Sequence, residues 1–182
     1  MNQCCIKLDQ CQLFDQMRIV WLRHVWWTRE VILSIANNLP STNDSVNKLL
    51  QNPAEMMAIF APYFPQKDKE IKMLTDLFTT HLKLGGDIVT AAKNGDTAKV
   101  TILQKQWHEN ADDIARAFHQ MCPCYNYETT RKMMYSHLQL TTDEAIAILQ
   151  SKFADGIKIF DNVQHEALMM ADYFSAGINF KH

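Results

Sequence analysis

The chain has 182 residues, of which 47% are hydrophobic, 21% charged and 10% aromatic, and its formal net charge is −2. This length fits one domain with a single sizeable core. The near-neutral charge without a basic block argues against nucleic acid as a partner, and no apolar run approaches the roughly 20 residues that span a bilayer. Since the first residues do not lead into the apolar stretch of a signal peptide, we expect a cytoplasmic protein with no membrane partner.

Helices are the expected secondary structure throughout. Only five glycines and five prolines are present, whereas the turns of β proteins usually need more of both. Apolar side chains recur in steps of three and four, as on one face of a helix, and strand-like alternation persists nowhere.

The N-terminal half is predicted to hold two long helices joined by a connector. The first, over residues 12–38, ends at Pro40, because proline disfavours helical geometry in the residue before it. The connector carries short helices over residues 44–51 and from Pro53 to before Pro62. The second long helix follows over residues 68–93.

The C-terminal half is predicted to hold the other two long helices. Asn94-Gly95-Asp96 separates the second helix from a third over residues 97–121, which makes these two antiparallel neighbours. A short helix over residues 127–138 comes next, and Thr141-Thr142-Asp143-Glu144 is typical of an N-cap that opens a last helix up to residue 176. Its inward-facing candidates are Leu149, Phe153, Ile157, Phe160, Gln164, Leu168 and Ala171.

These elements predict an all-α fold. The expected architecture is a four-helix bundle with two or three additional short helices. Residues 1–11 would form an N-terminal extension and residues 12–178 a single domain.

The five cysteines are Cys4, Cys5, Cys11, Cys122 and Cys124, and their spacing matches neither a disulfide framework nor a zinc knuckle. We therefore expect reduced thiols, the default in a cytosol. The alternative is a zinc site that joins the N-terminal cysteines to the C-terminal pair, although the Cys-x-x-Cys spacing of such sites is missing.

Three of the seven histidines lie on the inward faces of the predicted helices. Each is followed four residues later by a small residue, which leaves room beside the imidazole for a second ligand or a water. The pairs are His24 with Thr28, His81 with Gly85 and His137 with Thr141. The local strings around them resemble one another, as a duplicated helical hairpin would produce.

These histidines are candidate ligands of a metal ion in the core. Imidazole and carboxylate groups bind iron, zinc and manganese, and helical metalloproteins assemble such sites from facing helices. The expected carboxylate ligand is Glu144, two turns from His137 if that helix is continuous; a new helix capped by Thr142 would break this geometry. The residues expected to support the ligands are Thr28, Asn110, Asp113 and Asp172.

Several enzyme classes lack their sequence signatures here. No glutamate precedes a histidine by three residues, which disfavours a ferritin-type oxidase or iron store. A phosphate loop, a dinucleotide-binding turn and a nucleophile elbow are also missing. Whether the chain is an enzyme, and which small molecule it binds, is left open by the sequence.

The alternative to a metal site is a structural role for the three histidines, since buried imidazoles often bond a backbone carbonyl or a neighbouring side chain. The chain would then be a non-enzymatic helical module. It would bind a partner or form a homodimer through an apolar ridge that includes Trp26 and Leu33.

Several strings are similar to those of a known family. They are His24-Val25-Trp26-Trp27-Thr28-Arg29, Leu50-Gln51-Asn52-Pro53, His81-Leu82, Asn110-Ala111-Asp112-Asp113, His137-Leu138-Gln139-Leu140-Thr141 and Met170-Ala171-Asp172. They resemble motifs of a bacterial family of uncharacterised all-helical proteins of about 180 residues, a length within one domain. The resemblance runs from about residue 16 to residue 178 and implies a ferritin-like or related bundle whose His, Asn and Asp residues are motif positions. The N-terminal extension and Cys122-Pro123-Cys124 depart from the family pattern.

Overall fold

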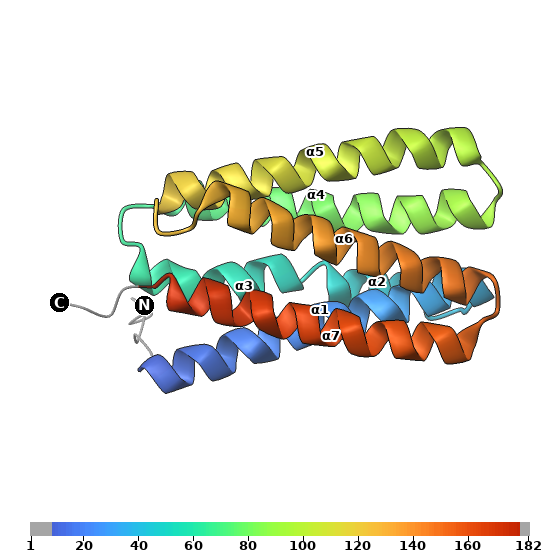
Figure 1. The fold of residues 1–182 in the computed structure, drawn as a ribbon, viewed down its shortest axis with the longest axis horizontal. Coiled ribbons are helices and arrows are strands. Elements are labelled where there is room, and N and C mark those ends of the chain that lie inside the picture. The colour runs from blue at the N-terminus through green and yellow to red at the C-terminus, as the bar shows by residue number, and fades with distance from the viewer. Residues whose placement is uncertain (1–8, 179–182) are drawn as a thin grey trace.

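The computed structural model describes residues 9–178, and over this range the protein is all-helical (Figure 1). The long helices are α1 (Gln10–Asn37), α4 (Asp68–Lys93), α5 (Thr97–Met121), α6 (Tyr127–Leu149) and α7 (Phe153–Ala176). The connector between α1 and α4 holds α2 (Thr42–Leu49), α3 (Asn52–Phe60) and the 3-10 turn η1 (Ala61–Tyr63). None of the described helices is both long enough and apolar enough to cross a membrane.

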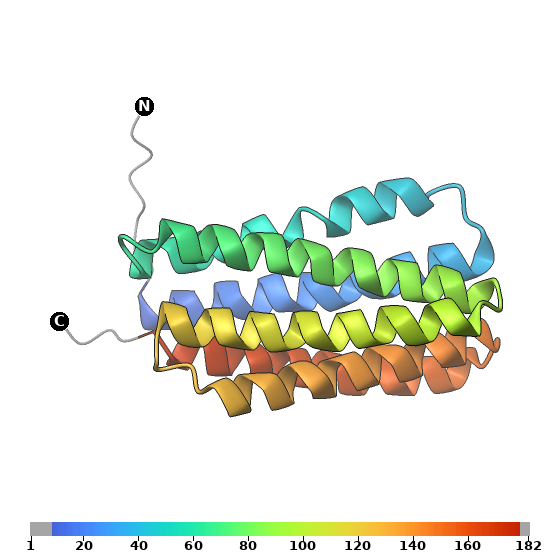
Figure 2. The same ribbon diagram turned by 90° about the horizontal axis from the view of Figure 1, so that it is seen from above.

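The long helices form one elongated bundle. α4 packs along α5, α5 along α6, α6 along α7 and α7 along α1, and α1 contacts α4, so that the helices enclose a common core (Figure 1). The connector packs on α1, with α3 also touching α4, and Figure 2 shows it beside α4 along one edge of the bundle.

The α4–α5 turn follows the local chemistry that the sequence indicates. Gly95 has φ of 72°, a left-handed conformation that glycine adopts without steric cost. The Asp96 side chain then accepts a hydrogen bond from the backbone N–H of Lys99 at 3.0 Å and caps α5. The boundaries predicted for these helices, residues 68–93 and 97–121, are confirmed.

The chain divides α6 from α7 at a different place from the one predicted. α6 runs without a break through Thr141 and Glu144, and the turn comes at residues 150–152 instead. There Ser151 takes φ of 58°, and the N–H of Lys152 donates to the carbonyl of Ala147 at 2.8 Å. The predicted break before Thr141 is therefore wrong, and residues 9–178 contain five long helices where four were expected.

The buried face of α7 also differs from the prediction. Phe153 and Ile157, two of the expected inward residues, are 46% and 56% exposed. The buried hydrophobic residues of the helix are Phe160, Val163, Ala167, Met170, Ala171 and Phe174. Phe160 and Ala171, on the same predicted face, are buried as expected, whereas Phe153 and Ile157 lie near the start of α7, next to the α6–α7 turn.

The α5–α6 connection contains a disulfide. Cys122 and Cys124 are bonded, with their Cα atoms 5.1 Å apart, where reduced thiols were expected. As a disulfide, the pair cannot supply the thiolates of the zinc site considered from the sequence. Cys11 is free and exposed on α1, and Cys4 and Cys5 lie outside the described residues.

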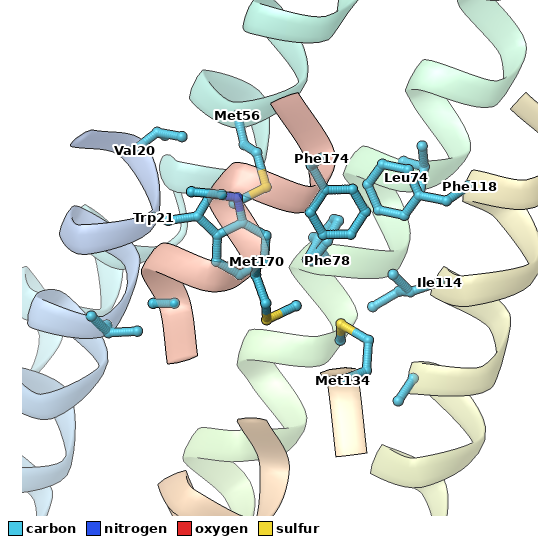
Figure 3. Close-up of a cluster of buried hydrophobic side chains, with 14 of the residues drawn as sticks. Val20, Trp21, Met56, Leu74, Phe78, Ile114, Phe118, Met134, Met170 and Phe174 are labelled. Atoms are coloured by element: carbon cyan, nitrogen blue, oxygen red, sulfur yellow. The ribbon is translucent and has the colours of Figure 1, made fainter. Parts of the chain in front are cut away.

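The centre of the bundle is an apolar layer to which six helices contribute (Figure 3). Six of its side chains, each at most 3% exposed, are Trp21, Met56, Phe78, Ile114, Met134 and Met170. The Trp21 ring stacks on that of Phe174, with centroids 5.8 Å apart and planes within 3°. Each of the six lies three or four residues, one helical turn, from a buried polar residue, so a polar layer lies next to the apolar one.

Candidate three-histidine site

His24, His81 and His137 meet inside the polar layer. They come from α1, α4 and α6, and each is 3% exposed. The ring centroids of His24 and His137 are 5.4 Å apart, and those of His81 and His137 are 6.4 Å apart. The fold thus brings together the three histidines that the sequence marked as candidates.

Asparagine side chains hold the first two rings in one orientation. His24 Nδ1 lies 3.2 Å from Asn52 Oδ1, and His81 Nδ1 lies 3.0 Å from Asn110 Oδ1. Each asparagine Nδ2 donates to the backbone carbonyl four residues before the histidine, at 3.0 and 3.1 Å. Because the amide nitrogen is committed to that carbonyl, the amide oxygen must face the ring. Nδ1 therefore carries the hydrogen and donates it, which leaves the lone pair on Nε2.

A carboxylate takes the asparagine's place at the third ring. His137 Nδ1 lies 3.2 Å from Oε2 of Glu166, a buried residue of α7. The other carboxylate oxygen, Oε1, has no hydrogen-bond partner among the described residues. A carboxylate that accepts from Nδ1 fixes the ring's tautomer and makes Nε2 more basic.

The same pairing recurs in three successive pairs of helices. In each pair the first helix carries the histidine and the second carries its partner, 28, 29 and 29 residues later. The pairs are α1 with α3, α4 with α5, and α6 with α7. No described residue makes a hydrogen bond to Nε2 of any of the three rings.

A cavity of about 120 Å³ lies on the side of the rings away from the apolar layer, toward the end of the bundle with the α4–α5 and α6–α7 turns. The three histidines line it together with Thr28, Gly85 and Thr141, the small residues one turn further along each helix. The room that these residues were expected to leave is present. Most of the remaining wall is apolar: Ile32, Leu49, Leu82, Ile88, Val89, Val100, Trp107, Ala145, Ile146 and Leu149.

Burial controls the charge of two of the rings. Loss of hydration lowers the pKa of His81 to about 3, and repulsion from His137 adds to the effect. The pKa of His24 is also well below its ordinary value, again mainly because of burial and then because of the neighbouring histidines. Both imidazoles are therefore neutral at neutral pH, the form that binds metal ions.

Glu144, the carboxylate predicted as a ligand, is buried but already paired. Its side chain accepts a hydrogen bond from Arg29 of α1 in a buried ion pair, and it does not line the cavity. Burial raises its pKa, and Arg29 opposes that rise. Glu166, and not Glu144, is the carboxylate that bonds one of the three histidine rings.

The predicted supporting residues divide into two groups. Asn110 bonds His81, and Thr28 lines the cavity. Asp113 and Asp172 do not reach the site: both lie at the surface of the bundle, where they form ion pairs with arginines. Asn52 and Glu166 were missed, although Asn52 lies in one of the family-like strings and could have been found there.

The three rings as they stand do not form a metal site. Among the residues that the structure describes, no group of three or more His, Cys, Asp or Glu side chains is arranged so that it could hold a metal ion. Comparisons with protein families, with curated proteins and with solved structures find no match to the chain. The family resemblance therefore stays a prediction from sequence motifs.

Proposed function

We propose that this protein binds one divalent metal ion through Nε2 of His24, His81 and His137. The observation that carries the proposal is that every Nδ1 is engaged by an oxygen, while the three rings line one cavity and no described residue bonds their Nε2 atoms. The Nε2 lone pairs are therefore available to a ligand, and one metal ion could bind all three.

The spacing of the rings supports binding after a small closure. Three imidazoles around one ion, with bonds of about 2.1 Å, place their centroids about 5 Å apart. The 5.4 Å between His24 and His137 fits this value, and the 6.4 Å between His81 and His137 exceeds it. His81 must therefore move toward the other rings when the ion binds. The cavity beside it leaves space for that movement.

Of zinc, iron and manganese, the ligand set favours zinc or iron, because imidazole suits these two and manganese prefers oxygen ligands. Three rings would leave at least one coordination position open, and the cavity lies beside them. Open positions characterise catalytic zinc, whereas structural zinc has four protein ligands. Asn52, Asn110 and Glu166 would hold the rings in the ligating tautomer.

The repeated pairing also bears on how the fold is built. The sequence suggested a duplicated helical hairpin, and the same histidine-to-partner bond in α1/α3, α4/α5 and α6/α7 supports three related units. Each unit would then contribute one ligand to the ion.

Elemental analysis tests the metal site. Untagged protein, stripped with chelator and dialysed against zinc, iron(II) or manganese in turn, should retain about one equivalent of ion. The His24→Ala/His81→Ala variant should lose it, while His165→Ala, an exposed histidine on α7, should keep it. Circular dichroism shows whether each variant is folded. A folded wild-type protein that retains none of the three ions would disprove the proposal.

The alternative function is that of an interaction module, and one observation favours it: the Trp26 ring on α1 is 57% exposed. Large apolar side chains in contact with solvent often belong to interfaces. Sedimentation at several concentrations distinguishes the two functions. Self-association that Trp26→Ser abolishes, in a protein indifferent to chelator, would favour the module.

A further inference from the structure

The cavity beside the histidines has the size of a small apolar ligand. An engineered protein cavity of about 150 Å³ lined by Leu, Ile and Phe binds benzene. The cavity here has about 120 Å³, and Ile32, Leu49 and Val89 belong to its wall. An apolar group of about six heavy atoms therefore fits it.

Two adjacent glycines leave part of the wall on α4 without side chains. A Cβ atom added at Gly85 would meet the Trp107 ring at 3.4 Å, and one added at Gly86 would meet nothing within 4 Å. Glycine inside a helix is less stable than alanine. No packing constraint explains the absence of a side chain at Gly86, and its effect is to leave volume open.

The same segment separates the cavity from solvent. Leu49, Leu82 and Gly86 line the cavity on one side, and they also line a surface hollow between α1, α2 and α4. This thin wall is the natural path for a molecule that enters from solvent.

The charges around the three rings indicate which polar head group a ligand in this cavity would carry. A divalent ion on three neutral imidazoles carries two positive charges, and the Glu166 carboxylate at His137 supplies one negative charge. Glu144 adds none, because Arg29 compensates it. One further negative charge completes neutrality in this buried place, where an uncompensated charge is costly.

A hydroxyl is also available to bind such a head group. Thr141 lines the cavity, is 7% exposed, and its Oγ1 has no hydrogen-bond partner among the described residues. The corresponding hydroxyl on α1, that of Thr28, instead donates to the carbonyl of His24 at 2.8 Å. The Thr141 hydroxyl is thus free to donate to an oxygen of a ligand.

From these features we propose that the cavity binds a small apolar monoanion, with the chemistry of a short-chain monocarboxylate, whose head group occupies the open position on the metal ion. The apolar tail lies along Ile32, Leu49 and Val89, and the Thr141 hydroxyl donates to the head group. This inference rests on the proposed metal site, so its test is designed to fail separately from the test of that site.

The test is isothermal titration of zinc-loaded protein with hexanoate, after metal analysis of the same sample. Hexanol and hexylammonium are the matched probes with the same tail. We expect hexanoate to bind at least about tenfold more tightly than either, because only the carboxylate supplies the missing charge.

Variants then locate the bound molecule. Gly86→Leu should fill the cavity, keep its zinc and weaken hexanoate binding about tenfold or more. Thr141→Val should keep zinc and weaken hexanoate binding by about two- to tenfold, the value of one hydrogen bond. Thr80→Leu, on an exposed part of α4 away from the cavity, is the control and should match the wild type.

The outcomes are distinct. Zinc-loaded protein that does not bind hexanoate, that binds hexanol equally well, or whose affinity Gly86→Leu leaves unchanged would overturn this inference and leave the metal site intact. If the protein holds no metal in the metal analysis, both the proposed metal site and this inference are overturned.

Discussion

Each of the three buried histidines is bonded to one partner side chain. Asn52, Asn110 and Glu166 bond the Nδ1 atoms, while Nε2 of each ring has no hydrogen-bond partner among the described residues. Polar side chains buried in this way normally have every donor and acceptor engaged. All three rings line the same cavity, so the proposed metal ion could reach each of them from there.

The lowered pKa values make the metal-free protein sensitive to acid. In the unfolded chain His24 and His81 take up protons near pH 6.5, whereas folded His81 stays neutral down to about pH 3, so acid favours unfolding. The stabilisation is complete above pH 6.5, and the free energy of unfolding should fall by about 1.4 kcal/mol per pH unit for each ring below it. Urea denaturation at pH 7.5, 6.5 and 5.5 measures the slope.

The ionisable groups that face these rings are His137, Glu166 and Glu144, and burial raises the pKa of Glu144. A His24→Gln/His81→Gln variant should lose most of the slope between pH 6.5 and 5.5. A wild-type slope of zero over that range would contradict the neutral, buried imidazoles.

At the scale of the helix, the sequence predicts those features that neighbouring residues determine, such as helix ends and inward-facing positions. Gly95 and Asp96 mark the α4–α5 turn because a left-handed residue and an N-cap have strong residue preferences. The inward histidines were found because 3.6-residue periodicity continues through α1 and α4.

The α6–α7 turn was missed for a physical reason. Its left-handed residue is Ser151, so neither glycine nor proline marks it, while the Thr-Thr-Asp-Glu string inside α6 looks like a cap. Ile157 was expected in the core because the last helix was predicted to begin near Thr141, whereas it lies near the start of α7 and is 56% exposed.

Arg29 joins three helices and should be important for stability. From α1 it forms the buried ion pair with Glu144 of α6, donates to the carbonyl of Gly156 of α7 at 3.3 Å, and lies 4.9 Å from the Phe160 ring. Arg29→Met leaves the Glu144 charge buried without a partner, and we expect it to lower the free energy of unfolding by about 3 kcal/mol. Chemical denaturation measures this loss.

Two further variants show whether the loss of stability in Arg29→Met comes from the unpaired charge. Arg29→Met/Glu144→Leu removes both charges and should recover much of the loss. Arg18→Met breaks the pair with Asp172, whose side chains are 44% and 42% exposed, and should cost less than about 1 kcal/mol. Equal effects of Arg29→Met and Arg18→Met would refute the importance given to the buried pair.

For the whole molecule, the site exists only when three helix pairs have docked. Contacts within each pair join residues 28 or 29 apart, whereas the rings themselves come from α1, α4 and α6. Local pairs form early in folding because little chain entropy opposes them, so we expect the three rings to meet late. Interactions absent from the transition state slow unfolding and leave the folding rate unchanged.

Zinc should therefore lower the unfolding rate and leave the folding rate unchanged. At a free zinc concentration about 1,000 times its Kd, the protein gains about 4 kcal/mol, which corresponds to an unfolding rate about a thousandfold lower. Stopped-flow circular dichroism in urea, with and without zinc, measures both the folding rate and the unfolding rate. Faster folding with an unchanged unfolding rate would mean that the rings meet before the transition state.

The position of two tryptophans gives the site an optical consequence. The Trp21 ring lies 5.7 Å from the His24 ring, and the Trp107 ring lies 5.1 Å from the His81 ring and donates from Nε1 to the His81 carbonyl at 3.0 Å. A paramagnetic ion such as cobalt(II) held by these histidines would quench the fluorescence of both indoles, while exposed Trp26 would keep emitting at longer wavelength. The tryptophans would thus act as an intrinsic spectroscopic reporter of the proposed metal site, and its occupancy could be followed without a label.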